Sequence, residues 1–300
     1  MGGSRPKPAF AFALIPFLVG APGLPRARGA VPEPPEPPAP PPPGAELPAL
    51  DLLGDARFLF FTGFVSAREN EVDGDRFYFR DLNADFGQQV GLSGRLNLTS
   101  RDRLELRGAW LNLRGSTSYD TARVFNETEF AAGTTIETKP DWLELRGSYL
   151  RRLFELPAAR SSLWFLFGID YHYINWKFEG TLTPRLGNEP SEDFYRQTFP
   201  LPVFGLRWLL DLGPEWSFDL RGDGFRANHW RHWEDEGGPI YTSSTIADVS
   251  GTFRWQPKKR FFIEAGYLFS YYTLDEDGPE DGNHLLTRQH GPVLGLGLSW

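Results

Sequence analysis

The chain has 300 residues, and its 31 Lys and Arg against 39 Asp and Glu give a formal net charge of -8 at pH 7. This acidic balance repels a phosphate backbone and argues against a nucleic-acid partner. The absence of cysteine excludes a disulfide scaffold, a thiolate metal site and a cysteine nucleophile. A mean hydropathy of -0.38 excludes several membrane-spanning helices, whereas 32 Gly and 15% aromatic residues favour all-β structure.

Residues 1–30 have the features of a cleaved secretory signal. Arg5 and Lys7 precede the apolar run Ala9–Val19, which is too short to cross a membrane as a helix. Cleavage after either Ala21 or Ala30 is compatible with this pattern. Residues 31–54 then form a proline-rich linker, because prolines fix φ and remove hydrogen-bond donors. The tract is interpreted as a plain spacer, and contact with the cell wall is the alternative.

From residue 55 to residue 300 apolar and polar residues alternate with period two. Leu104 and Leu106 alternate with Glu105 and Arg107, for example. Clear alternating segments begin at residues 86, 104, 143, 163, 204, 218, 247, 261 and 294. A first, less regular strand near residues 57–67 brings the expected number to about ten.

The connections between these segments alternate between short turns and long polar loops. Such alternation predicts an antiparallel, up-and-down transmembrane β-barrel with both chain ends in the periplasm. A soluble β-sandwich is the alternative fold. Residues 121–137 leave the strand count open, since a hairpin there either raises it to twelve or projects above the membrane. The long loops are expected at residues 68–76, 115–138, 179–197, 228–239 and 274–284.

The two faces of the strands differ in a way that suggests their orientation. The polar face repeats an acid-x-base motif, which suits a lumen crossed by ion pairs, and the apolar face suits lipid. The predicted lumen network consists of Arg95, Glu105, Arg107, Glu144, Arg146, Arg207, Asp219, Arg221, Asp248, Arg254 and Glu264. Tryptophans expected near strand ends or along the lipid face are Trp110, Trp142, Trp164, Trp176, Trp208, Trp216, Trp255 and Trp300.

The last residues carry a family resemblance. Leu294, Leu296, Leu298 and the terminal Trp300 alternate with small residues. This stretch resembles the final strand of bacterial outer-membrane β-barrels, in which a terminal aromatic is read by the barrel-assembly machinery. The resemblance implies a periplasmic route to the outer membrane of a Gram-negative bacterium, with that machinery, outer-membrane lipid and lipopolysaccharide as partners.

Few residues point to catalysis. Asp170 and His172 are two apart and therefore share a strand face, and omptin-type outer-membrane proteases carry an Asp and a His with this spacing. Omptins add a pair of aspartates across the barrel mouth, which neither Asp219 with Asp223 nor Asp275 with Asp277 clearly supplies. A role in the lumen hydrogen-bond network is therefore the favoured interpretation of Asp170 and His172.

The sequence also gives little evidence for a metal or cofactor. His229 and His232 could bind a metal if their segment were helical, but a loop at the lipid headgroup level is favoured. Neither a metal site nor a cofactor is expected. Because ten strands enclose a narrow interior, the charged lumen is expected to be largely plugged and the barrel to act as a structural scaffold for surface loops. A narrow pore or transport protein and an omptin-like hydrolase are the alternatives, and the chain is expected not to be an enzyme.

Removing Trp300 tests the proposed assembly signal. If the terminal aromatic is read during assembly, the shortened chain accumulates outside the membrane. Membrane fractionation, together with the gel shift between unheated and boiled samples, measures this loss. Normal assembly of the shortened chain would contradict the assignment.

Overall fold

The computed structural model describes residues 50–69, 73–126, 128–180, 182–183, 191–193, 197–235, 239–278 and 281–300. The predicted signal peptide and all but the last residues of the predicted linker lie outside these ranges. Strands dominate the described residues, with one 3-10 turn at Pro157–Ala159. No helix among them is long and apolar enough to span a membrane.

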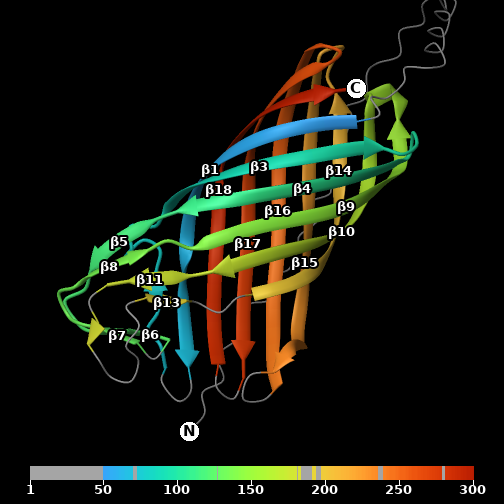
Figure 1. Cartoon of the computed structure of the whole chain (residues 1–300). Helices are drawn as coiled ribbons and strands as arrows, with labels where there is room; N and C mark the ends of the chain where they lie inside the picture. The colour runs from blue at the N-terminus through green and yellow to red at the C-terminus, as the bar shows by residue number, and fades with distance from the viewer. Residues whose placement is uncertain are drawn as a thin grey trace, which may run out of the picture. The chain divides into compact units, whose positions relative to one another are not determined.

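Ten long antiparallel strands form one closed barrel (Figure 1). Each strand pairs with its neighbour in chain order, and the last strand pairs with the first. The ladder between these two strands extends from the Asp51–Ser299 pair to the Glu69–Asp281 pair. Closure leaves no strand edge of the barrel unpaired, as a membrane environment requires. The strands are β1 (Leu50–Glu69), β3 (Phe86–Asn97), β4 (Asp102–Leu113), β9 (Asp141–Leu156), β10 (Ser161–Asn175), β14 (Gln197–Asp211), β15 (Trp216–Asp235), β16 (Pro239–Lys258), β17 (Phe261–Asp277) and β18 (Asp281–Ser299). The predicted all-β, up-and-down barrel of about ten strands is confirmed.

The remaining strands are short and build an outer extension of the barrel. None except β2 pairs with a barrel strand, and they lie at the end of the barrel opposite the C-terminus (Figure 1). The hairpin considered at residues 121–137 projects beyond the barrel, so the alternative count of twelve barrel strands is wrong. The short strands are β2 (Phe77–Tyr78), β5 (Gly115–Ser118), β6 (Arg123–Phe125), β7 (Thr128–Phe130), β8 (Thr135–Thr138), β11 (Lys177–Glu179), β12 (Leu182–Thr183) and β13 (Ser191–Asp193).

Two predicted boundaries need correction. The first strand begins at Leu50, inside the segment expected to be linker, because Asp51 faces the lumen and pairs with Arg254 at 2.8 Å. The loop expected at residues 228–239 is mostly strand, since β15 continues to Asp235 and β16 begins at Pro239. His229 therefore lies in a strand. Register shifts in the pairing of β15 with β16, between Ala227 and Trp230 and between Arg231 and Asp235, interrupt the alternation here.

The outer wall of the barrel is apolar. Leu106 is 69% exposed, Leu296 is 61% exposed and Trp110 is 50% exposed. Glu105, the residue before Leu106, is buried inside the barrel. Apolar side chains facing outward and charged side chains facing inward are the arrangement of a transmembrane barrel, in which lipid replaces water as the outer solvent.

Three of the tryptophans expected near the lipid are interior residues. Trp142, Trp164 and Trp176 are almost fully buried, whereas Trp110, Trp208, Trp216, Trp255 and Trp300 are exposed. The reason is strand parity, the rule that successive side chains of a strand point to opposite faces. Trp142 and Trp164 each adjoin outward-facing residues and so point inward.

Cross-linking tests the closure between β1 and β18. Ala56 and Leu294 are directly paired, so the double variant Ala56→Cys/Leu294→Cys places two thiols within disulfide distance in a chain that otherwise lacks cysteine. Oxidation is expected to change the electrophoretic mobility of the boiled, non-reduced protein, because the disulfide closes a large loop in the unfolded chain. Ala56→Cys/Leu298→Cys is the control, because Leu298 lies about 13 Å further along β18. Equal cross-linking of the two variants would contradict the register.

Candidate functional site

The lumen is crossed by a continuous network of ion pairs. Arg207 on β14 pairs with Glu105 on β4, although two other strands separate β14 from β4 in the sheet. Arg95 on β3 similarly reaches Glu264 on β17 at 2.9 Å. Side chains of strands that are not neighbours in the sheet can meet only through the barrel interior. These pairs therefore fasten opposite walls to each other.

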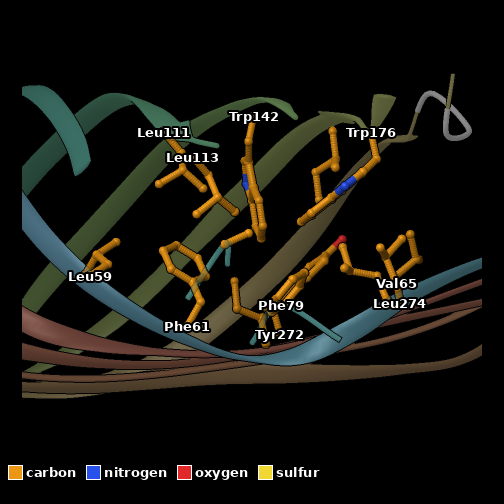
Figure 2. Close-up of a cluster of buried hydrophobic side chains, with 14 of the residues drawn as sticks. Leu59, Phe61, Val65, Phe79, Leu111, Leu113, Trp142, Trp176, Tyr272 and Leu274 are labelled. Carbon is orange, nitrogen blue, oxygen red and sulfur yellow. The ribbon is translucent and has the colours of Figure 1, made fainter. Parts of the chain in front are cut away.

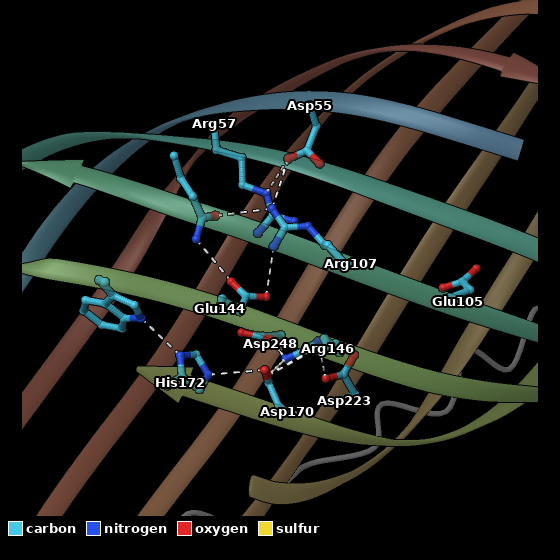
Figure 3. A network of polar contacts seen from close by, with 12 residues as sticks. Asp55, Arg57, Glu105, Arg107, Glu144, Arg146, Asp170, His172, Asp223 and Asp248 are labelled. Carbon is cyan, nitrogen blue, oxygen red and sulfur yellow. Dashed lines mark hydrogen bonds and ion pairs between the residues drawn. The ribbon is translucent and has the colours of Figure 1, made fainter. Parts of the chain in front are cut away.

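Arg146 forms the centre of this network (Figure 3). Its guanidinium group donates to Asp170 at 2.9 Å, to Asp223 at 3.0 Å and to Asp248 at 2.6 Å. Arg221 links this cluster to the rest, because it pairs with Asp223 at 2.6 Å and with Glu105 at 3.4 Å. The connected network contains five arginines and seven carboxylates. They are Asp51, Arg95, Glu105, Arg146, Asp170, Arg207, Asp219, Arg221, Asp223, Asp248, Arg254 and Glu264.

A second, smaller network lies beside the first. Arg107 pairs with Asp55 at 3.1 Å and with Glu144 at 2.9 Å, and Asp55 also pairs with Arg57 at 3.1 Å. The amide of Gln89 donates to the same Glu144 at 3.1 Å. Charges in this group balance, since two arginines face two carboxylates.

The structure places all eleven predicted lumen residues in these ion pairs. It adds five charged residues that were not predicted as part of the network. Asp51 lay in the predicted linker, and Asp170 was considered only with His172. Asp55, Arg57 and Asp223 could have been found from strand parity, because each lies two residues from another inward-facing charge.

Asp170 and His172 do share one face of β10, but their partners are structural. Asp170 is fully buried and bound to Arg146. The indole of Trp142 donates to Nδ1 of His172 at 3.1 Å, while Nε2 lies 3.5 Å from Asp170. Tyr272 packs against the same imidazole, with ring centroids 4.9 Å apart. Both side chains are enclosed by these groups.

Little open space remains among the charged side chains. A cavity of about 140 Å³ is lined by members of both networks, among them Glu144 and Arg221. Nε of Arg107, Nη2 of Arg221 and Oγ of Ser148 are buried there without a hydrogen-bond partner from the described protein atoms. A polar cavity of this size holds a few water molecules, which would satisfy such groups.

An aromatic core fills the lumen towards the outer end (Figure 2). Phe61, Phe79 and Trp176 are almost fully buried there. Phe79 stacks on Trp176 with ring centroids 5.2 Å apart, and Phe61 meets Phe79 edge to face at 6.2 Å. The segment that follows β2 supplies Phe79, which lies between the first predicted loop at residues 68–76 and the strand predicted from residue 86. Charged and aromatic layers thus occupy the lumen in series.

The aromatic core continues into the outer extension. Phe178 of β11 packs against Phe77 at 4.7 Å and against Phe125 at 4.4 Å between ring centroids. Tyr119 meets Phe77 edge to face, and burial raises the pKa of its phenol. The short outer sheets are therefore fixed to the barrel by apolar packing as well as by their connections.

Potential metal ligands do not gather in the described part of the chain. No group of three His, Asp or Glu side chains there has the spacing to hold a metal ion. His229 instead stacks on Tyr241 with ring centroids 4.1 Å apart, and its backbone N–H donates to Ser243. The side chain of His232 lies outside the described residues.

No protein-family model matches the chain, and no curated protein matches it. Among solved structures, it is similar to the outer membrane protease OmpT from Escherichia coli, at 11% identity and a TM-score of 0.47, over 83% of this chain and 97% of that one. The translocator domain of the autotransporter NalP from Neisseria meningitidis gives 11% identity and a TM-score of 0.40, over 84% and 88%. The attachment invasion locus protein Ail of Yersinia pestis gives 10% identity and a TM-score of 0.25, over 82% and 99%. These proteins differ in activity, and the similarities concern the fold alone.

Substituting Arg146 tests how much the ion-pair network in the lumen contributes to the free energy of unfolding. Arg146→Gln leaves three buried carboxylates without their common partner, and breaking a buried pair in this way costs about 3–5 kcal/mol of unfolding free energy. Urea unfolding of the refolded protein, followed by tryptophan fluorescence, measures the loss. Arg151→Gln is the control on the same strand, since Arg151 is 58% exposed and its ion pair with Asp102, at 3.1 Å, is exposed to solvent. A stability loss no larger than that of the control would contradict the central role of Arg146.

Proposed function

We propose that the chain is a closed barrel of the Gram-negative outer membrane that serves as a structural scaffold for its outer extension. The observation that carries this proposal is the filling of the lumen by two layers in series, one of ion pairs and one of aromatic side chains. A solute path would have to separate charges that bridge opposite walls and also displace rings that pack against each other. The filled barrel is therefore a rigid base to which the short outer sheets are attached.

The proposed orientation places both ends of the barrel, Leu50 and Trp300, in the periplasm. The backbone of Trp300 donates to Leu50 at 2.9 Å, so the start and the end of the barrel lie side by side. With these ends in the periplasm, the proline-rich linker is a periplasmic spacer, and the short outer sheets face the cell exterior. Trp300 and the apolar residues before it act as the assembly signal read by the barrel-assembly machinery.

The proposal assigns no reaction to Asp170 and His172. The carboxylate is bound to Arg146, and the imidazole lies among Trp142, Tyr272 and Asp170. A general base must reach the proton that it removes from a substrate. Both groups instead support the charged layer, where His172 connects the ion pairs to the aromatic core.

Conductance measurements in planar bilayers test the two-layer plug. The wild-type protein is expected to be silent, and so is each variant that weakens one layer, Arg146→Gln or Phe61→Ala/Phe79→Ala. The triple variant is expected to give reproducible steps that favour cations, because carboxylates outnumber arginines in the connected network. The gel shift between unheated and boiled samples verifies folding of every variant. Steps from the wild-type protein that change with Arg107→Ser or Arg146→Ser would support the narrow pore instead.

A further inference from the structure

Three polar side chains lie side by side across the outer ends of β17, β18 and β1. Asp275 of β17 is paired with His284 of β18, and His284 is paired in turn with Ser66 of β1. Residues directly opposite each other on antiparallel strands point to the same face, with Cβ atoms about 4.5–5.5 Å apart. The register therefore aligns a carboxylate, an imidazole and a hydroxyl, in that order, on the outer face of the barrel.

The three residues line a cleft of about 600 Å³ at this end of the barrel. A cleft of this volume accommodates a small organic molecule. Residues 73–76 border it and lie closely on β1, where a Cβ atom added at Gly74 would be 1.8 Å from the carbonyl oxygen of Ala67. The other titratable or charged residues that line the cleft are Arg68, Asp73, Arg76, His229, Tyr241, Glu276 and Asp277.

Asp275 orients the imidazole of His284. Oδ1 of Asp275 lies 3.0 Å from Nδ1 of His284, and the two side chains are 57% and 51% exposed. This hydrogen bond raises the pKa of His284, although partial burial and the nearby Arg76 and Arg68 oppose the shift. Because the carboxylate occupies Nδ1, Nε2 is the nitrogen left to accept a proton. An imidazole held in this way by a carboxylate is the general base of a serine nucleophile in many hydrolases.

Ser66 supplies a hydroxyl beside this base. It is 6% exposed, so it lies at the sheltered side of the cleft. Within the described residues its Oγ forms no hydrogen bond that would compete with His284. Rotation about χ1 changes the position of Oγ without moving the strand, and the bond between nucleophile and base is often long before a substrate binds.

Two arginines place positive charge beside the row. The guanidinium of Arg68 lies against Gly282, where an added Cβ atom would be 2.7 Å from its Nε, and it also pairs with Asp277 at 3.5 Å. Arg76 lies over the ring of Phe64, 4.9 Å from its centroid, and Phe64 is two residues from Ser66 on the same face of β1. Positive groups next to the nucleophile stabilise the oxyanion that forms when a carbonyl is attacked.

We infer that Ser66, His284 and Asp275 form a site that hydrolyses carboxylic esters. Oγ of Ser66 attacks the carbonyl carbon while Nε2 of His284 takes the hydroxyl proton. The ester C–O bond then breaks, and His284 returns the proton to the leaving alcohol. Water attacks the resulting acyl-Ser66 with the same base, which releases the carboxylic acid and restores the serine. Asp275 acts through His284 and is a positioning residue.

The surface next to Ser66 suits an ester with an apolar acyl group. Tyr78 is paired with Phe64, is 45% exposed and meets the Phe64 ring at 5.7 Å between centroids. These rings offer an apolar contact close to the nucleophile, while the charged groups face the rest of the cleft. The site lies on the outer wall, so it does not depend on whether the lumen conducts.

Covalent labelling with a fluorophosphonate tests the nucleophile. The refolded full chain in detergent is expected to gain one adduct, which peptide mass spectrometry locates at Ser66. Ser66→Ala is expected to abolish the adduct. His284→Asn is expected to slow labelling at least about 100-fold, the usual contribution of a general base. The gel shift between unheated and boiled samples verifies folding of each variant.

His290→Asn is the matched control for His284→Asn. His290 lies on the same strand, and its ring is hydrogen-bonded to the hydroxyl of Tyr267 at 2.6 Å. Labelling of this variant is expected to equal that of the wild-type protein. Absence of an adduct at Ser66 in the folded wild-type protein would overturn the site, and so would equal labelling rates in the wild-type protein and His284→Asn.

The pH profile of labelling separates the role of Asp275 from a structural one. The rate is expected to rise with pH as His284 loses its proton, with a midpoint above the usual imidazole value of about 6.5. Asp275→Asn is expected to move this midpoint to lower pH, because Arg68 and Arg76 then act on the imidazole without the carboxylate, and also to lower the plateau. An unchanged midpoint would overturn the role of Asp275.

Turnover of p-nitrophenyl butyrate tests the substrate class. Release of p-nitrophenolate by the wild-type protein, followed by absorbance, is expected to fall to the uncatalysed rate in Ser66→Ala. Labelling of Ser66 without hydrolysis of this ester would overturn the assignment to carboxylic esters.

Discussion

The structure depends on the pairing of charges across a space that admits almost no solvent. Arg207 is 3% exposed and lies between Glu105 and Asp219, which come from different walls of the barrel. A lone guanidinium at such a site would lose its hydration without compensation, and a lone carboxylate likewise. The charges that pair across the lumen are therefore tolerable only while the opposite wall stays in place. The narrowness of a ten-stranded barrel makes such contacts possible, since side chains from both walls reach the centre.

The two fillings of the lumen have different consequences. Ion pairs are directional, and those around Arg146 demand one register among β9, β10, β15 and β16. The aromatic core requires less exact positions of its side chains. Its ring contacts run continuously from Phe61 in the lumen through Phe79 to Trp176, and so connect the lumen to the loops. The end of the barrel nearest Leu50 and Trp300 is thus aligned by charge, and the outer extension is attached by apolar packing.

Much of the barrel could be predicted from the sequence because apolar and polar residues still alternate along its strands. Lipid only reverses which of the two faces outward. Leu106 and Glu105 alternate as they would in a soluble sheet, and only the choice of outer solvent had to be argued from acid–base repeats and loop lengths. Outside the membrane that signal fades. Phe77 and Phe79 alternate with exposed residues over too short a stretch to be distinguished from a loop, and the residues that bury them come from distant segments such as β11.

The same limit applies to the site. Strand parity indicates which charges face inward, but it does not give the pairing, because pairs such as Arg95 with Glu264 depend on how the barrel closes. For Asp170 and His172, spacing alone left catalysis open. What assigns them to the charged layer is Arg146 on the neighbouring strand and the indole of Trp142.

The long sequence separation of the ion pairs bears on how the barrel reaches the membrane. Asp51 and Arg254 come from opposite ends of the polypeptide, and Glu105 and Arg207 are also far apart along it. A hairpin entering the bilayer by itself would carry some of its inward charges into hydrocarbon without their partner, as Asp51 would be without Arg254, although others, such as Arg207 and Asp219, pair within one hairpin. Only a nearly complete circle of strands neutralises all of them. Insertion and closure should therefore be a single cooperative event, and an incomplete barrel would have no stable place in the bilayer.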